Sequence, residues 1–229
     1  MRKIRCQTHI SYLKKIADNS IMVNFFYSML LIIMLAFGSC VGVSSGTIDR
    51  TGTEMQKPEF PTYIMGEGQV NAREMALFLV QNNPRLQMSF ALQFARLYIE
   101  EASFEGVNHD VAFVQMCLET GFLSFGNLVT ADQNNFAGLG ATGLPGPDGK
   151  PDKGLYFPDL RTGVRAHVQH LKAYASTENL NNPLVNPRRR FVRLGSSPTI
   201  DGLAGTWAAD RQYAVKLKAM LQRLYDLDF

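Results

Sequence analysis

The segment NHDVAFVQMCLETG, residues 108–121, decides how the rest of the chain is interpreted. It has the pattern of a short buried helix, with Asn108 suited to the N-cap and Gly121 placed where a helix ends. Only Gln115 and Glu119 interrupt its apolar run, and because they are four residues apart they share one face. The sequence therefore predicts a core helix with one polar face that borders a cleft.

Glu119 falls in the last turn of this helix, where the helix dipole presents negative charge. Apolar neighbours and an adverse dipole both favour the protonated form of a carboxyl group. A carboxyl group that keeps its proton is what a general acid requires. The alternative is that Glu119 simply reaches the surface at a helix end, and this segment alone leaves both interpretations open.

The composition is that of one ordinary domain. The chain has 229 residues, of which 46% are hydrophobic and 19% charged, with a formal net charge of +3. This length supports one hydrophobic core and argues against two large domains. No basic helix face with interleaved aromatic residues indicates a nucleic-acid partner. The dense basic run at residues 188–190 follows Asn-Pro and is interpreted as a solvated turn, with an anion site as the alternative.

Basic residues precede a long apolar stretch, residues 21–40, near the N-terminus. The order is similar to that of a bacterial lipoprotein signal peptide, in which Phe37-Gly-Ser-Cys40 is the lipobox and Cys40 the acylated first residue of the mature chain. An uncleaved membrane anchor is the alternative, because the run approaches spanning length. Both interpretations place the rest of the chain in the cell envelope, tethered to a membrane and outside the cytoplasm, as in a periplasmic or outer-membrane lipoprotein.

Three regions follow from these patterns: a signal peptide at 1–39, a lipidated N-terminus and flexible tether at 40–70, and a helical domain at 71–229. Apolar periodicity in the domain predicts five helices, at 72–80, 88–103, 108–120, 162–175 and 210–227. Residues 131–161, between the third and fourth helices, are rich in Gly, Pro, Asn and Asp. They predict a turn-dominated lobe, for which a small β-hairpin is one interpretation.

Two patterns have some character of a metal site. Asp148 to Asp152 has a passing likeness to a calcium loop but lacks regular oxygen ligands and a closing Glu, which favours a turn. His167 and His170 share a helix face but have no evident further ligands, which favours histidines at the core edge or surface. Cys117 lies alone on an apolar face and is interpreted as a buried thiol. We therefore expect no metal and no cofactor.

Glu119 beside a polar, aromatic-bearing lobe suits an extended sugar polymer, and here the chain resembles the glucosaminidase-domain family of bacterial cell-wall hydrolases. The family carries a Glu-Ser-Gly-like triplet at a helix end, matched by Glu-Thr-Gly at 119–121. An Asn-Asn-(Leu/Phe)-Phe-Gly-like stretch is matched by Asn-Asn-Phe-Ala-Gly at 134–138, and a Tyr-Ala-Thr-Asp-x-x-Tyr-like element by Trp-Ala-Ala-Asp-Arg-Gln-Tyr at 207–213. The resemblance covers about 71–227, and its motifs occur in the family's order.

The resemblance implies a mainly α, lysozyme-like fold with a small β or loop lobe, and cleavage of the bond after N-acetylglucosamine in peptidoglycan glycan strands. It makes Glu119 the general acid. The residues that it implies for the glycan cleft are Asn135, Phe136, Trp207, Asp210 and Tyr213. Trp207 replaces a common Tyr, so that hydroxyl group is missing, although an indole N–H can still donate a hydrogen bond. The pair at 122–123, Phe-Leu, replaces a more usual Trp-Gly.

A second catalytic group is not identified by these patterns. An inverting hydrolase needs a second carboxylate at about 6.5 to 9.5 Å, and a retaining one needs it at about 5 to 5.5 Å. Asp148, Asp152 and Asp159 are the candidates in the lobe. Alternatively, the substrate's N-acetyl group acts as the nucleophile. The rival functions are a muramidase or lytic transglycosylase of the same fold, and a non-catalytic lipoprotein that binds glycan or acts as a scaffold. The sequence gives no indication of the oligomeric state.

Overall fold

The computed structural model describes residues 59–146 and 148–227. They belong to one compact unit, Gln56–Phe229. The signal peptide, Cys40 and most of the tether lie outside the described residues and stay predictions. Within the described part of the chain, no helix combines the length and the apolar character that crossing a membrane requires.

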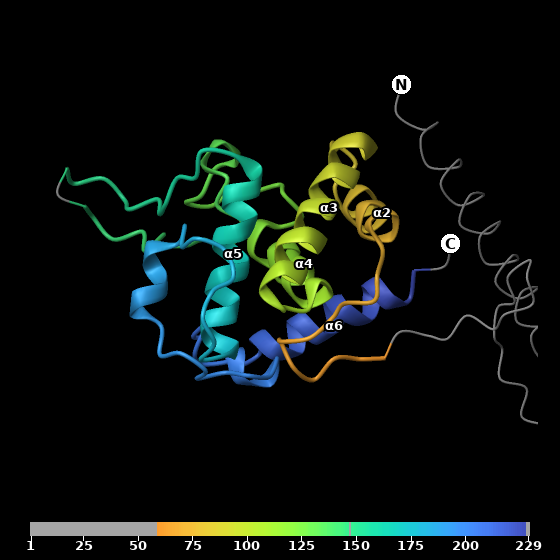
Figure 1. The fold of residues 1–229 in the computed structure, drawn as a ribbon. Helices are drawn as coiled ribbons and strands as arrows, with labels where there is room; N and C mark the ends of the chain where they lie inside the picture. Colours follow the sequence, from red (N-terminus) through yellow and green to blue (C-terminus); the bar gives the residue numbers. More distant parts are fainter. Residues whose placement is uncertain (1–58, 147, 228–229) are drawn as a thin grey trace, which may run out of the picture. The chain divides into compact units, whose positions relative to one another are not determined.

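Helices dominate the described residues, and the prediction of a mainly α fold is confirmed. No regular strand is present in this part of the chain, and the likeness to lysozyme stays a prediction. The helices, labelled in Figure 1, are α2 (Ala72–Asn82), α3 (Met88–Glu105), α4 (His109–Thr120), α5 (Leu160–Ala175) and α6 (Tyr213–Tyr225). Short 3-10 turns are η1 (Ala131–Gln133), η2 (Pro187–Phe191) and η3 (Asp201–Leu203).

Helix α4 forms the centre of the unit and packs against α3, α5 and α6 (Figure 1). Its residues 111–117 are all buried, so the helix is enclosed by the protein on every side for two turns. The Asn108 side chain accepts hydrogen bonds from the backbone N–H groups of Asp110 and Val111, at 3.0 and 3.2 Å. Gly121 ends the helix in the left-handed conformation, with φ 56°. The predicted caps of this helix are both confirmed.

Residues 59–70, which the composition assigned to the tether, pack on the helical unit. Ile64 is fully buried, and Val70 also lies in the core. The N–H of Ile64 donates to Pro198 O at 3.0 Å, and its carbonyl accepts from the N–H of Asn108 at 2.9 Å. The described unit therefore includes these residues, and the boundary expected at residue 70 lies too late. A short extended segment held by backbone hydrogen bonds has no helical periodicity to reveal it.

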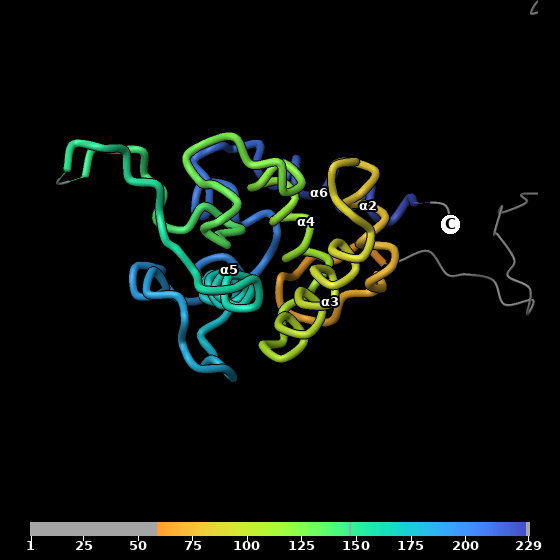
Figure 2. Tube along the Cα trace, turned by 90° about the horizontal axis from the view of Figure 1, so that it is seen from above, coloured from red at the N-terminus to blue at the C-terminus, as the bar shows by residue number. Residues whose placement is uncertain are grey.

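The lobe between α4 and α5 ends in a hairpin that projects from the helices (Figures 1 and 2). Figure 2 shows α5 nearly end-on, with α3 on one side and the hairpin on the other. The N–H of Gly143 donates to Asp152 O at 3.1 Å, and the N–H of Asp152 donates to Leu144 O at 2.9 Å. The arms form an isolated bridge between Pro145 and Pro151. Proline has no N–H, so a regular ladder cannot form across this pair.

Side-chain amides fix the base of the lobe. Gln133 Nε2 donates to Lys153 O at 3.0 Å, and Asn134 Nδ2 donates to Phe157 O at 3.0 Å. Gly163 in α5 then meets the lobe at close range, because a Cβ on Gly163 would lie 1.9 Å from Asn134 O. A helical glycine is needed here for the close approach of two backbones, which sets the lobe against α5.

We expect Gly163→Ala to destabilise the protein by about 1–3 kcal/mol, the range for overpacking. In a solvent-exposed helix the same change stabilises by about 1 kcal/mol, because alanine has the higher helix propensity. Urea unfolding of the chain and of the variant checks the sign. A higher unfolding midpoint in the variant would contradict the close approach of α5 to Asn134.

Candidate active site

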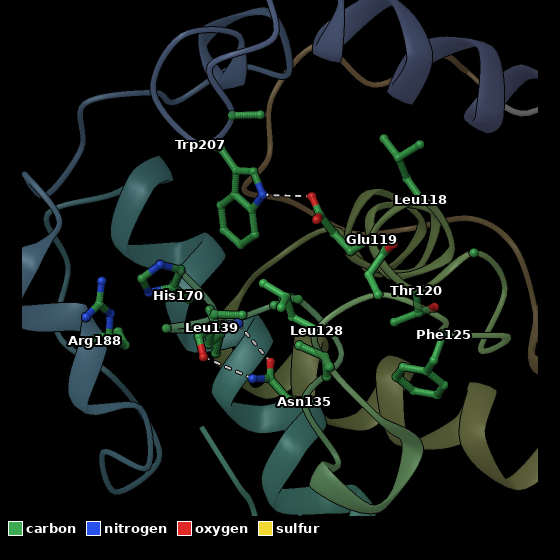
Figure 3. Close-up of a pocket in the computed structure, with 18 of the residues that line it drawn as sticks. Leu118, Glu119, Thr120, Phe125, Leu128, Asn135, Leu139, His170, Arg188 and Trp207 are labelled. Carbon is green, nitrogen blue, oxygen red and sulfur yellow. Dashed lines mark hydrogen bonds between the residues drawn. The ribbon is translucent and has the colours of Figure 1, made fainter. Parts of the chain in front are cut away.

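A cleft of about 560 Å³ lies where the end of α4, the lobe, α5, η2 and the segment before α6 meet (Figure 3). The cleft therefore joins segments that are far apart in the sequence. The residues that line it and carry the discussion below are Glu119, Asn135, Leu139, His170, Tyr174, Arg188, Trp207 and Tyr213.

The carboxyl group of Glu119 is held through one of its two oxygens. Oε1 accepts a hydrogen bond from Trp207 Nε1 at 2.9 Å and another from Tyr213 Oη at 2.5 Å. Figure 3 shows the first of these across the cleft. Oε2 accepts no hydrogen bond from the described residues. The carboxyl group is thus oriented by two donors on one side, and its other oxygen is left to carry a proton.

The protonation of Glu119 follows from its burial. Removal from water raises the pKa of the Glu119 carboxyl above its usual value, against the lowering effect of the hydrogen bonds from Tyr213 and Trp207. Burial also raises the pKa of Tyr213, and the neighbouring Glu119 carboxylate adds to the effect. Tyr213 therefore remains a neutral donor while Glu119 changes its protonation state.

A buried row of side chains supports Tyr213 from behind. Gln115 Nε2 donates to Tyr213 Oη at 3.0 Å, and Gln115 Oε1 lies 2.9 Å from His167 Nε2. His167 Nδ1 lies 2.9 Å from Tyr98 Oη. Burial lowers the pKa of His167 to about 3, so the ring is neutral. Nε2 then donates to Gln115, Nδ1 accepts from Tyr98, and every donor in the row has an acceptor.

The segment after α4 has an uncommon backbone. Phe122, Leu123 and Phe125 have φ values of 56°, 60° and 54°, in the left-handed region that side chains disfavour. Thr120 holds this segment, because its Oγ1 accepts from the N–H of Leu123 and its carbonyl accepts from the N–H of Phe125. Leu123 stands where the family more usually has Gly, so this chain keeps a glycine-like conformation there at an energetic cost.

Two of the implied cleft residues have structural contacts. Asn135 lines the cleft, but its Oδ1 accepts from Leu139 N at 2.8 Å and its Nδ2 donates to Leu139 O and Leu155 O (Figure 3). Phe136 is 3% exposed and lies in the core, with its ring centroid 4.8 Å from that of Phe94. Asn135 shapes the lobe wall through the backbone, and Phe136 supports the lobe from within the core.

The remaining carboxylates that the sequence singled out lie away from the cleft lining. Asp210 is exposed and pairs with Lys216 at 2.6 Å. Asp148 and Asp152 are exposed on the hairpin, and Asp159 is the N-cap of α5. Among the described residues, Glu119 is the one acid that lines the cleft. No group of three or more His, Cys, Asp or Glu in this part of the chain is placed to hold a metal ion.

Among the residues that the structure brings to the cleft and that the sequence did not assign to it are His170, Tyr174 and Arg188. The His170 ring lies 5.3 Å from the Trp207 ring, and the Tyr174 ring lies 5.4 Å from it, measured between centroids. The spacing of His170 and Tyr174 on one helix face is visible in the sequence. Their position at the cleft depends on the packing of α5 against the segment before α6, which no local pattern reports.

We expect Tyr213→Phe to raise the pKa of Glu119 further, because it removes a donor that favours the ionised form. The change also leaves the buried Gln115 Nε2 without its acceptor, which costs about 1–3 kcal/mol of stability. A ¹³C NMR titration of the Glu119 carboxyl carbon measures the pKa. Tyr225→Phe is the matched control, because its hydroxyl group donates to Asp110 instead. An unchanged or lowered pKa in Tyr213→Phe would contradict the assigned contact.

The chain is similar to a known family and to a known protein. The family model described as glucosaminidase, mannosyl-glycoprotein endo-beta-N-acetylglucosaminidase, matches residues 95–226, which is more than half of the chain. An uncharacterized protein of Borreliella burgdorferi is 38% identical over 183 residues, which cover 80% of this chain and 87% of that protein. Glu119, Trp207 and Tyr213 all lie within the matched range. The chain therefore belongs to the mannosyl-glycoprotein endo-beta-N-acetylglucosaminidase (glucosaminidase) family.

Proposed function

We propose that the protein is a peptidoglycan hydrolase that cleaves the glycosidic bond after N-acetylglucosamine in cell-wall glycan strands. The observation that carries the proposal is the state of Glu119. Its carboxyl group borders the cleft, has a raised pKa, and is held through Oε1 by Trp207 and Tyr213. This is the arrangement of a general acid that presents its proton to a bound substrate.

The reaction begins with protonation of the glycosidic oxygen. Oε2 of Glu119 holds the proton, because Oε1 already accepts two hydrogen bonds. As the bond to the leaving sugar breaks, the proton moves to the leaving oxygen and Glu119 becomes a carboxylate. Trp207 and Tyr213 then stabilise the new charge on a group that was costly to ionise before. Activity depends on protonated Glu119 and is expected to fall as the pH rises through its raised pKa.

The nucleophile in this proposal is the N-acetyl group of the substrate. Among the described residues, no carboxylate other than Glu119 lines the cleft. A two-carboxylate mechanism needs a partner within about 10 Å, and the lobe candidates are bound elsewhere or exposed. With the acetamide oxygen as internal nucleophile, Glu119 first acts as the acid and then deprotonates the water that opens the intermediate. Asp148, Asp152 and Asp159 are then dispensable for the chemistry.

The single carboxylate also favours a second candidate, a lytic transglycosylase. There a hydroxyl group of the substrate replaces water, so one residue can again act as acid and base. The products separate the two reactions, because hydrolysis leaves reducing sugars and transglycosylation leaves anhydro-muramic ends. A lysozyme-like fold belongs to both proposals.

The place of action proposed is the cell envelope, with the chain held to a membrane through lipid on Cys40. The support is the lipobox-like sequence that ends at Cys40. Labelled palmitate is expected to enter the full-length chain in bacterial cells and not its Cys40→Ser variant. Equal labelling of both, or of neither, would contradict the anchor.

Digestion of purified peptidoglycan by the chain and by its Glu119→Gln variant tests the function. Mass spectrometry is expected to find fragments that end in reducing N-acetylglucosamine from the parent chain. The variant should lose about 10²- to 10⁴-fold in rate, the usual contribution of a general acid. Glu178→Gln is the matched control, because Glu178 is exposed and does not line the cleft. Binding to intact peptidoglycan with no release of fragments would favour a non-catalytic glycan-binding protein.

A further inference from the structure

The end of the cleft beyond Trp207 contains two hydrogen-bond donors that the proposed reaction does not use. His170 on α5 and Arg188 on η2 both line the cleft. Figure 3 shows both of them beyond Trp207 as seen from Glu119. The Trp207 indole joins the two ends, because its Nε1 donates to Glu119 and its ring packs edge-on against His170. The two donors are thus separated from the acid by one indole ring.

The hydrogen bond from Asn186 determines which ring nitrogen of His170 carries the hydrogen. Asn186 Oδ1 accepts from the backbone N–H of Arg188 at 3.0 Å, so Asn186 Nδ2 is the atom that lies 2.8 Å from His170 Nδ1. An amide nitrogen only donates, so Nδ1 accepts and the hydrogen of the neutral ring is on Nε2. Burial and the nearby Arg188 charge lower the pKa of His170 to about 4. The Nε2–H group has no acceptor among the described residues.

Arg188 is a cation without an internal counter-charge. Its guanidinium group forms no ion pair and no hydrogen bond with the described residues, in contrast to Arg161 and Arg165, which both bind Glu101. The guanidinium carbon lies 4.8 Å from the centroid of the Phe191 ring, which supports one face of the group. A planar cation held in this way suits a carboxylate ligand, because it offers donors in a rigid fork.

We propose that His170 and Arg188 bind a carboxylate of the peptide stem carried by the sugar next to the cleaved bond. The inference rests on the proposed function. In an alternating glycan, the sugar on the leaving side of an N-acetylglucosaminyl bond carries a lactyl-linked peptide with free carboxylates. Sugar hydroxyl and acetamide groups are neutral and need no guanidinium partner. A positively charged site one ring away from the acid matches the charged substituent of that sugar.

Equilibrium binding to the Glu119→Gln chain tests this assignment without reliance on turnover. The ligands are glycan tetrasaccharides with intact stems, with stem carboxylates amidated, and with stems removed. Arg188→Gln is expected to weaken binding of the intact ligand about tenfold and to leave the other two unchanged, a loss of about 1.4 kcal/mol. Arg190→Gln is the matched control, because Arg190 stacks on the same Phe191 ring at 4.7 Å but does not line the cleft.

Three results would overturn the assignment of a stem-binding site to His170 and Arg188 while leaving the proposed peptidoglycan function standing. They are an equal loss of affinity for ligands with and without stems, an equal loss in Arg190→Gln, and no preference for intact stems over amidated ones. Failure of the Glu119→Gln chain to bind any of the three glycans would overturn the proposed peptidoglycan function, and the stem site with it. Arg188→Lys keeps the positive charge but not the forked donor geometry of the guanidinium group. It is expected to bind the intact ligand with an affinity between those of Arg188→Gln and Arg190→Gln.

Discussion

The two hydrogen bonds accepted by Glu119 Oε1 are the interaction on which the site depends. They join the end of α4 to Trp207 and to Tyr213, the first residue of α6, which lie 88 and 94 residues further along the chain. A carboxyl group partly buried at the negative end of a helix is costly to ionise. The two donors offset part of that cost and fix the direction of the group. The same contacts therefore limit the rise in the pKa of Glu119 and fix the orientation of its carboxyl group.

The rest of the fold holds these partners in place. Helix α4 is buried on all sides, so its end cannot shift without disturbing the core. Tyr213 is backed by Gln115, whose amide is oriented by the neutral His167. The lobe forms the wall of the cleft that faces these residues. Buried amides such as Asn135 hold this wall in place, because they form hydrogen bonds with the lobe backbone. Trp207, which stands where the family commonly has Tyr, gives Glu119 an indole N–H donor and no phenol hydroxyl.

Features coded by short segments were predictable from the sequence. The caps of α4, the shared face of Gln115 and Glu119, and the adverse position of Glu119 all follow from spacing within one helix. Features that depend on distant packing were not predictable. Phe136 is apolar, and no local pattern distinguishes a core ring from a sugar platform. His170 and Arg188 line the same cleft because contacts such as the one between Asn186 and His170 hold η2 against α5. The basic run at 188–190 gives no sign of which arginine lines the cleft.

The most direct measurement of acid catalysis by Glu119 compares two leaving groups. An N-acetylglucosamine oligomer with a dinitrophenyl aglycone needs no protonation to depart, whereas a sugar leaving group does. First-turnover release is measured for the parent chain and for Glu119→Gln on both substrates. If Glu119 is the general acid, the variant loses about 10²-fold or more on the sugar leaving group and little on dinitrophenol. An equal loss on both substrates would contradict that role, and so would no loss on either.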